Sequence, residues 1–269
     1  MKSRFALAIL SLAASLTHAQ TAWYVSPDGD DGDGKTWATA KRTIQAAIDI
    51  ASAGDTITVT NGTYAPIATA NLAITIHSVN GAEHTIIDGG GTNRCATLGT
   101  VVSQTNTIIK GFTLRNGQAS SGGGSSSGML YDCTLSNNTA NYGGGANLGI
   151  LSRCVLLGNT ANNGGGGSYN GILNNCILIE NKVKSTSSYY GGGGAFRGTL
   201  NNCTLVGNAA GWSGGGSYES TLNNCILWGN TNMSGVINNY YDSSFNYSCT
   251  TPLPGGIGKQ PIIRKNQFL

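Results

Sequence analysis

The feature that most constrains the fold is a ten-residue segment that recurs five times with a cysteine at a fixed position. The copies read MLYDCTLSNN (129–138), ILSRCVLLGN (150–159), ILNNCILIEN (172–181), TLNNCTLVGN (199–208) and TLNNCILWGN (221–230). Successive cysteines are 21, 22, 27 and 22 residues apart, and in every copy Asn follows Cys by five residues. A fixed period in this range is typical of a solenoid, in which each coil packs only against its neighbours.

The composition of the units favours strands over helices. They are rich in Gly, Asn, Ser and Thr, which are poor formers of helix interiors, so a leucine-rich repeat is excluded. About 22 residues at roughly 3.3 Å each make one triangular coil, and coils stack about 4.8 Å apart. Equivalent Leu, Cys and Asn residues should therefore form columns, with Asn at a turn where it tolerates a left-handed conformation. We predict an all-β fold, a right-handed parallel β-helix, whose hand follows from the rule for parallel crossovers.

The seven cysteines allow two interpretations. Five share one phase of the repeat between inward leucines, which favours a column of buried thiols. The coil spacing also lies within the Cα range of a disulfide, so bridges are the alternative, although an odd number leaves one thiol unpaired. A metal site is less expected because the repeats contain no His.

The N-terminus resembles an export signal. Lys2 and Arg4 precede a short apolar run, and small residues follow, so residues 1–19 are predicted to be a signal peptide and the protein to be secreted or held at the outer cell surface. No other apolar run is long enough for a transmembrane segment. The 15 basic and 12 acidic residues nearly balance, so nucleic acid is not an expected partner.

Residues 20–65 are predicted to form an N-terminal cap and the first coil. Thr43–Ser52 has one apolar face and should form a short capping helix that covers the open end of the first coil. Residues 66–250 should form the remaining coils. Residues 251–269 depart from the repeat and are interpreted as a C-terminal tail or an incomplete cap.

Several motifs in the cap and the coils carry a family resemblance. The cap contains YVSPDG (24–29), WAT (37–39), TIQAAI (43–48), GDTI (54–57) and GTY (62–64). These resemble the N-terminal cap of secreted β-helix proteins of the pectin-lyase-like superfamily. The units with Gly-Gly-Gly-Ala or Gly-Gly-Gly-Ser and a later Leu-x-x-Asn resemble the repeats of polymorphic outer membrane proteins. The resemblance implies the β-helix fold, while the superfamily includes lyases, hydrolases, adhesins and proteins without known activity.

Enzymes of this superfamily need converging carboxylates, either to bind Ca²⁺ or to act as acid and base. From residue 89 onward the acids are only Asp132, Glu180, Glu219 and Asp242, and the first three differ in phase relative to Cys. Glu219 shares its phase with Arg197, which predicts a surface ion pair. We therefore expect a non-catalytic repeat protein that is adhesin-like or contacts glycans. A polysaccharide lyase or glycoside hydrolase is the alternative.

One acidic cluster could bind a metal. Asp28, Asp30, Asp31 and Asp33 lie in PDGDDGDG, where closely spaced carboxylates and glycines could wrap Ca²⁺. The spacing is not that of an EF-hand. The alternative is a solvated loop of Asx turns without a cofactor.

The aromatic residues of the repeats form two sets. Tyr169, Phe196 and Tyr218 each precede their Cys by seven residues and are predicted to stack in the core. A second set lies in loops of variable length that should share one edge of the rod, where rings could stack on sugar faces and lysines could contact acidic groups. These candidate carbohydrate-binding residues are Tyr142, Tyr189, Tyr190, Trp212, Lys182 and Lys184. The partner would be an extracellular polysaccharide or a cell-surface protein, and the alternative role is loop packing.

Overall fold

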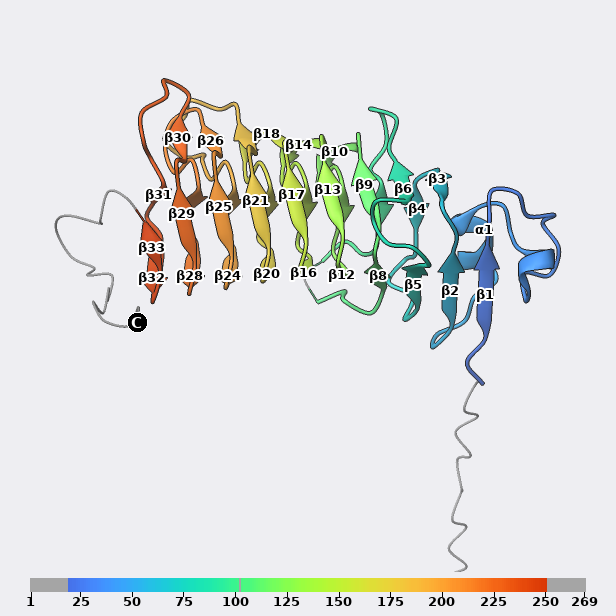
Figure 1. Cartoon of the computed structure of the whole chain (residues 1–269). Helices are drawn as coiled ribbons and strands as arrows, with labels where there is room; N and C mark the ends of the chain where they lie inside the picture. The colour runs from blue at the N-terminus through green and yellow to red at the C-terminus, as the bar shows by residue number, and fades with distance from the viewer. Residues whose placement is uncertain (1–18, 102, 251–269) are drawn as a thin grey trace, which may run out of the picture.

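The computed structural model describes residues 19–101 and 103–250, which form one rod of stacked coils (Figure 1). Nearly all of the predicted signal peptide and the predicted tail 251–269 lie outside the described residues. Every pairing between named strands is parallel, and each strand pairs with the equivalent strand of the next coil, as the repeat predicts.

The strands form four parallel sheets that run along the rod. The first sheet contains β1 (Ala22–Val25), β2 (Thr56–Val59), β5 (Thr75–Ser78), β8 (Ile108–Lys110), β12 (Met129–Tyr131), β16 (Ile150–Ser152), β20 (Ile172–Asn174), β24 (Thr199–Asn201), β28 (Thr221–Asn223) and β32 (Ser244–Asn246). The second contains β3 (Gly62–Tyr64), β6 (Thr85–Asp88), β9 (Thr113–Arg115), β13 (Thr134–Ser136), β17 (Val155–Leu157), β21 (Ile177–Ile179), β25 (Thr204–Val206), β29 (Ile226–Trp228) and β33 (Cys249–Thr250). The third contains β4 (Ile67–Ala68), β7 (Ala96–Thr97), β11 (Ser125–Ser126), β15 (Ala146–Asn147), β19 (Ser168–Tyr169), β23 (Ala195–Phe196), β27 (Ser217–Tyr218) and β31 (Tyr240–Tyr241).

The fourth sheet is an addition that the expected triangular coil omitted. It contains β10 (Gln118–Ser121), β14 (Thr139–Tyr142), β18 (Thr160–Gly164), β22 (Lys182–Val183), β26 (Ala209–Ala210) and β30 (Thr231–Asn232). In each of these coils the chain leaves the second sheet, forms the fourth-sheet strand, and returns to the third sheet. The return passes through a glycine run in the first five coils and through residues 233–239 after β30. We call this excursion the flap. It encloses a small apolar cluster of its own, made of Ala161, Val183 and Ala210.

The interior of the coil contains the predicted columns. Leu130, Leu151, Leu173 and their equivalents in the first sheet are fully buried, and a second leucine column faces them from the second sheet. The repeat cysteines lie at the corner between these columns as buried free thiols, which confirms the thiol column. The Cys176 thiol, for example, donates hydrogen bonds to the carbonyls of Leu151 and Asn174 at 3.5 and 3.3 Å.

The repeat asparagines form a buried column that is held by side-chain amides. The Asn181 Nδ2 donates to Leu156 O and to Asn208 Oδ1, both at 2.9 Å, and its Oδ1 accepts from Asn159. The expectation that these asparagines adopt the left-handed conformation is wrong. The residue immediately before them has the positive φ, as at Asn137 (φ 55°). This left-handed residue turns the side chain of the repeat asparagine inward. There the side-chain amide bonds backbone N–H and C=O groups that have no backbone partner at the turn.

The glycine runs are required by close packing against this column. A Cβ atom on Gly145 would lie 2.6 Å from Gly167 O and 3.1 Å from Asn159 Nδ2. Any larger side chain would therefore separate the flap from the coil, which explains why the flap returns through glycine.

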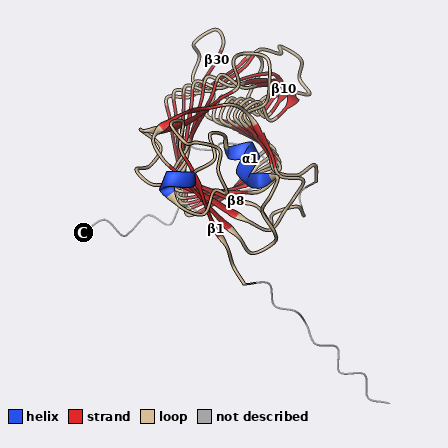
Figure 2. Cartoon of the chain, turned by 90° about the vertical axis from the view of Figure 1, so that its right-hand side faces the viewer, coloured by secondary structure: helices blue, strands red, loops and turns tan. Residues whose placement is uncertain are grey.

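A short cap covers the N-terminal end of the rod. Figure 2 shows α1 (Ile44–Ile48) lying across the open end of the coil. The helix is shorter than the predicted Thr43–Ser52, because Thr43 is its N-cap and accepts a hydrogen bond from Ala46 N. A 3-10 turn, η1 (Trp37–Thr39), precedes it. None of the helices in residues 19–101 and 103–250 has the length and hydrophobicity needed to span a bilayer.

Candidate polysaccharide-contact site

The predicted aromatic core column is real but lies outside the coil interior. In the third sheet, the inward positions belong to small residues such as Ser168 and Ala195, which are buried. Tyr169, Phe196 and Tyr218 face outward and stack edge to face, with centroids 5.3 and 5.0 Å apart. They fill the crevice between the third sheet and the flap, so their assignment to the coil core is wrong.

Three of the loop rings join this aromatic column. The Tyr142 ring lies 5.1 Å from that of Tyr169, and its hydroxyl donates to the Tyr190 hydroxyl at 3.4 Å. The Trp212 ring lies 4.8 Å from that of Tyr241. The structure therefore brings Tyr142, Tyr190 and Trp212 to one side of the rod, but half-buried and in contact with other rings. The geometry favours loop packing for these three side chains.

The other three candidates are exposed to solvent. Tyr189 is 78% exposed at the tip of the longest flap. Lys182 and Lys184 alternate with buried Val183, so both ammonium groups lie on the outer face of the fourth sheet. The backbone N–H of Lys184 donates to Ala161 O at 3.0 Å, which extends the parallel pairing of β22 with β18. This pairing keeps Lys182 and Lys184 on the same face of the sheet.

The lysines belong to a row of polar side chains that we call the polar track. Its members are the outward residues of four consecutive fourth-sheet strands: Gln118, Ser120, Thr139, Asn141, Thr160, Asn162, Lys182 and Lys184. The Asn162 Nδ2 donates to Asn141 Oδ1 at 2.8 Å, so these two amides are oriented along the rod. The strands of the fourth sheet contain no acidic residue.

A shallow depression of about 280 Å³ begins where the polar track begins. It exists because the coil before β10 has no fourth-sheet strand, which leaves one side of β10 uncovered. Its lining is polar or backbone: Gly90, Gly91, Asn116, Gly117, Gln118, Asn137 and Thr139. Gln118 and Thr139 belong to both features, so the depression and the track form one surface.

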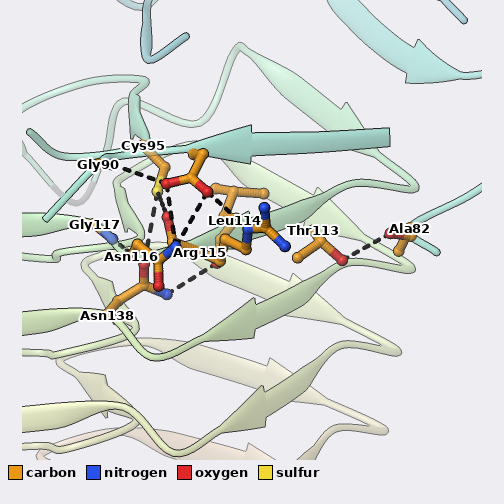
Figure 3. Close-up of polar contacts among 10 residues, drawn as sticks. Ala82, Gly90, Cys95, Thr113, Leu114, Arg115, Asn116, Gly117 and Asn138 are labelled. Atoms are coloured by element: carbon orange, nitrogen blue, oxygen red, sulfur yellow. Dashed lines mark hydrogen bonds and ion pairs between the residues drawn. The ribbon is translucent and has the colours of Figure 1, made fainter. Parts of the chain in front are cut away.

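An ion pair lies beside the depression. The Arg115 Nε donates to Asp88 Oδ2 at 2.7 Å, while Gly90 N donates to Asp88 Oδ1 at 2.9 Å and the Asn116 amide donates to both oxygens. Figure 3 shows these contacts around Arg115, Asn116 and Gly90. Burial raises the pKa of Asp88, but the hydrogen bonds from Arg115, Gly90 and Asn116 outweigh it and hold the pKa below its usual value. Among the described residues, the guanidinium of Arg115 is held only through Nε, which leaves its terminal NH₂ groups available to a ligand.

Sequence reasoning missed this pair. Asp88 and Arg115 lie in two successive coils that lack the repeat cysteine, so alignment on Cys did not bring them together. The available signal was the match of TIIDGG (85–90) with TLRNG (113–117), because β6 and β9 place Asp88 opposite Arg115.

The four acidic residues of the cap do not converge. Asp30 Oδ1 accepts from Gly32 N at 2.8 Å, Asp31 Oδ1 from Arg42 N at 2.8 Å, and Asp33 Oδ1 from Thr39 Oγ1 at 2.6 Å. Asp30 and Asp33 each close a local turn, whereas Asp31 contacts Arg42, which lies outside its turn, and Asp28 uses its backbone N–H to bond Ser26 Oγ. Within residues 19–101 and 103–250, no three His, Cys, Asp or Glu side chains are grouped as a metal site would require. The hydrogen bonds of Asp30 and Asp33 to the backbone two residues on are those of Asx turns, and Ca²⁺ binding by this loop stays a prediction.

The predicted ion pair of the repeats is confirmed. Arg197 Nε lies 2.6 Å from Glu219 Oε2, and the guanidinium lies 4.9 Å from the Phe196 ring centroid. Asp132 is likewise bound by Arg153, whose Nε and Nη2 donate to the two carboxylate oxygens at 2.7 and 2.8 Å. Both acids are thus used in structural pairs on the surface.

Comparisons with known proteins identify the fold alone. No protein-family model and no curated protein matches the sequence, so the likeness to polymorphic outer membrane repeats stays a sequence-based expectation. Among solved structures, the pectin methylesterase PemA from Erwinia chrysanthemi matches with a TM-score of 0.53 at 10% identity, over 91% of this chain and 94% of that chain. A pectate lyase, Pel9A, matches with a TM-score of 0.45 at 11% identity, over 86% and 80% of the two chains. A rhamnogalacturonan lyase matches with a TM-score of 0.43 at 14% identity, over 90% and 85%.

Proposed function

We propose that this chain, which has the right-handed parallel β-helix fold of pectin-lyase-like proteins, is a non-catalytic extracellular protein that contacts polysaccharide along the polar track. The observation that carries the proposal is the exposed face of the fourth sheet, where two lysines follow rows of amides and hydroxyls without any carboxylate. The predicted signal peptide supports the extracellular location.

The chemistry of this face suits an extended acidic polymer. Lys182 and Lys184 supply ammonium groups for carboxylates, and the Asn and Thr side chains can donate to or accept from sugar hydroxyls. At the other end of the track, the polar side chains of Gln118, Asn137 and Thr139 line the depression, where they can hydrogen-bond sugar hydroxyls. Equivalent side chains repeat about every 4.8 Å along the rod, so weak contacts can add up over a long polymer.

The geometry gives less support to hydrolysis or elimination. Acid–base cleavage of a glycosidic bond needs two positioned carboxyl groups, or a base near the proton to be removed. Of the residues that the structure describes, Asp88 supplies the carboxylate beside the depression. Its oxygens already accept hydrogen bonds from Arg115, Gly90 and Asn116. Its lowered pKa also makes it a poor proton donor near neutral pH.

The test is binding to immobilised polyuronates and to a neutral polysaccharide by the parent and by the Lys182→Ala, Lys184→Ala double variant. Lys110→Ala is a matched control, because Lys110 is an exposed lysine on the first sheet, away from the track. We expect the double variant to lose most binding to the polyuronate and its salt dependence, while the control binds like the parent.

Two results would contradict the proposal. Equal binding by the double variant and the control would place the site elsewhere. Release of unsaturated or reducing products from any of these polysaccharides by the parent would establish an enzyme and favour the lyase or hydrolase alternative.

A further inference from the structure

The outer face of the second sheet changes chemistry along the rod. Toward the N-terminus its outward residues are polar, as in Thr113 and Ser136. From β17 onward the same two columns become mainly apolar, and Thr204 is the one polar residue among the outward residues of β17, β21, β25 and β29. We call this part the apolar face, and it consists of Val155, Leu157, Ile177, Ile179, Val206, Ile226 and Trp228.

These side chains are outside the core, and four of them are strongly exposed, while Val155, Ile179 and Val206 are half-buried. Leu157 is 39% exposed, Ile177 42%, Ile226 50% and Trp228 61%. The inward residue of each strand, such as Leu178 in β21, already fills the coil interior. The flap lies beyond the next corner of the coil, so no element of the described chain covers the apolar face.

The chemistry of the apolar face selects its partner. Six of the seven side chains are aliphatic and offer no hydrogen-bond donor or acceptor, so a polysaccharide docked here would lose water from its hydroxyls without compensation. A parallel sheet of short strands presents a flat, regularly ridged surface. Such a surface packs best against another apolar sheet about 10 Å away, with the side chains of the two faces interdigitated.

We propose that the apolar face docks on the apolar face of a second copy of this chain. The contact would be isologous, since the same patch is used on both copies. The seven side chains expose roughly 500 Å² per copy, within the range of about 300–600 Å² typical of the largest patch on a monomer. Two faces would together bury about 1,000 Å², the lower limit for a specific interface, so the dimer should be weak and dependent on concentration.

The proposal is independent of the polysaccharide hypothesis. The polar track lies on the fourth sheet and the apolar face on the second, so the dimer leaves both tracks accessible. A dimer would then present two tracks to one polymer, and its apparent affinity would rise with protein concentration if the track binds polysaccharide.

The test is sedimentation equilibrium of the full mature chain over a wide concentration range, with reductant present because Cys249 is exposed. The variant is Ile177→Lys with Ile226→Lys, which places two unpaired charges in the contact. The matched control is Ile172→Lys, because Ile172 is an outward isoleucine, 39% exposed, on the first sheet. Thermal unfolding of all three proteins checks that they remain folded.

We expect the parent and the control to dimerise with similar constants and the double variant to associate at least about tenfold more weakly. Emission of the exposed Trp228 should shift to shorter wavelength as the parent associates. A parent that stays monomeric at all concentrations would overturn the proposal. So would equal association of the double variant and the parent, or an equal loss in the control.

Discussion

Removing one amide from the middle of the asparagine column should destabilise the protein more than any surface change. Asn181 is fully buried, and its side chain takes part in four hydrogen bonds. Asn181→Ala removes the acceptor shared by Asn159 Nδ2 and the Asn159 backbone N–H, the donor to Leu156 O, and the side-chain donor to Asn208 Oδ1. Because Asn159, Asn181 and Asn208 are all fully buried, the groups left without a partner lie away from solvent.

The magnitude follows from those four contacts. A typical hydrogen bond contributes about 1 kcal/mol net, and a buried group left without a partner costs about 1–3 kcal/mol. Partial relaxation of the glycine run limits the total, so we expect a loss of about 3–5 kcal/mol in the free energy of unfolding. Domains of this kind are stable by about 5–15 kcal/mol, so the melting temperature should fall by about 10 °C.

Chemical denaturation followed by circular dichroism measures the loss, and two variants serve as controls. Asn181→Leu restores the volume but not the hydrogen bonds, so it should be nearly as unstable as Asn181→Ala. Asn162→Ala removes an exposed amide with a single bond to Asn141 and should cost under about 0.5 kcal/mol.

Because each coil contacts only its neighbours, Asn181→Ala should also separate unfolding of the two halves of the rod into distinct transitions. The reasoning would be refuted if Asn181→Ala cost no more than Asn162→Ala. Full recovery of stability in Asn181→Leu would show that packing, not hydrogen bonding, holds the column.

Three further predictions concern the thiols and the ion pair beside the depression. Cys176→Ser should cost about 1 kcal/mol in denaturant unfolding, because the hydroxyl can reuse the carbonyl acceptors of the thiol but fills less volume. In the native protein a thiol reagent should modify the exposed Cys249 at once and the six buried cysteines only after unfolding, because burial keeps the reagent from them. Rapid reaction of all seven, or of none, would contradict this. The pKa of Asp88 is lowered in the folded state, so its stabilising contribution is present above the unfolded value of about 3.9 and is lost as the pH falls through the lower folded value. Asp88→Asn should therefore reduce the fall in melting temperature between neutral pH and pH about 3, and an unchanged acid profile would show that the pair contributes nothing.

Much of the fold could be predicted because a parallel coil converts position in the repeat into position in space. The spacing of Cys154 and Cys176 was enough to predict stacked thiols between leucine columns, and the structure confirms both. The same logic predicted contact between Arg197 and Glu219, 22 residues apart, from their shared phase. These predictions required only that successive coils stack in register.

The sequence was less informative about which way a side chain faces. Phe196 follows the inward Ala195 by one residue, so its side chain points out of the coil. It is buried because the flap covers it, and the predicted triangular coil did not include a flap. The same omission hid the packing of Tyr142 and Tyr190. The Asp88–Arg115 pair was missed for another reason, because the coils near the cap lack the cysteine that marks the phase.

The asparagine column also has an electrical consequence. From Asn138 to Asn230 every Nδ2 donates toward the C-terminal neighbour, so the amide dipoles are aligned over the length of the column. On the outer face of the first sheet a second row of asparagines runs in the opposite sense, since Asn201 Nδ2 donates back to Asn174 and Asn246 Nδ2 donates back to Asn223. Aligned amides polarise one another, so the hydrogen bonds of each row become stronger as the row becomes longer. Because the two rows run in opposite directions, their dipoles partly cancel and the net electric field at the two ends of the rod stays small.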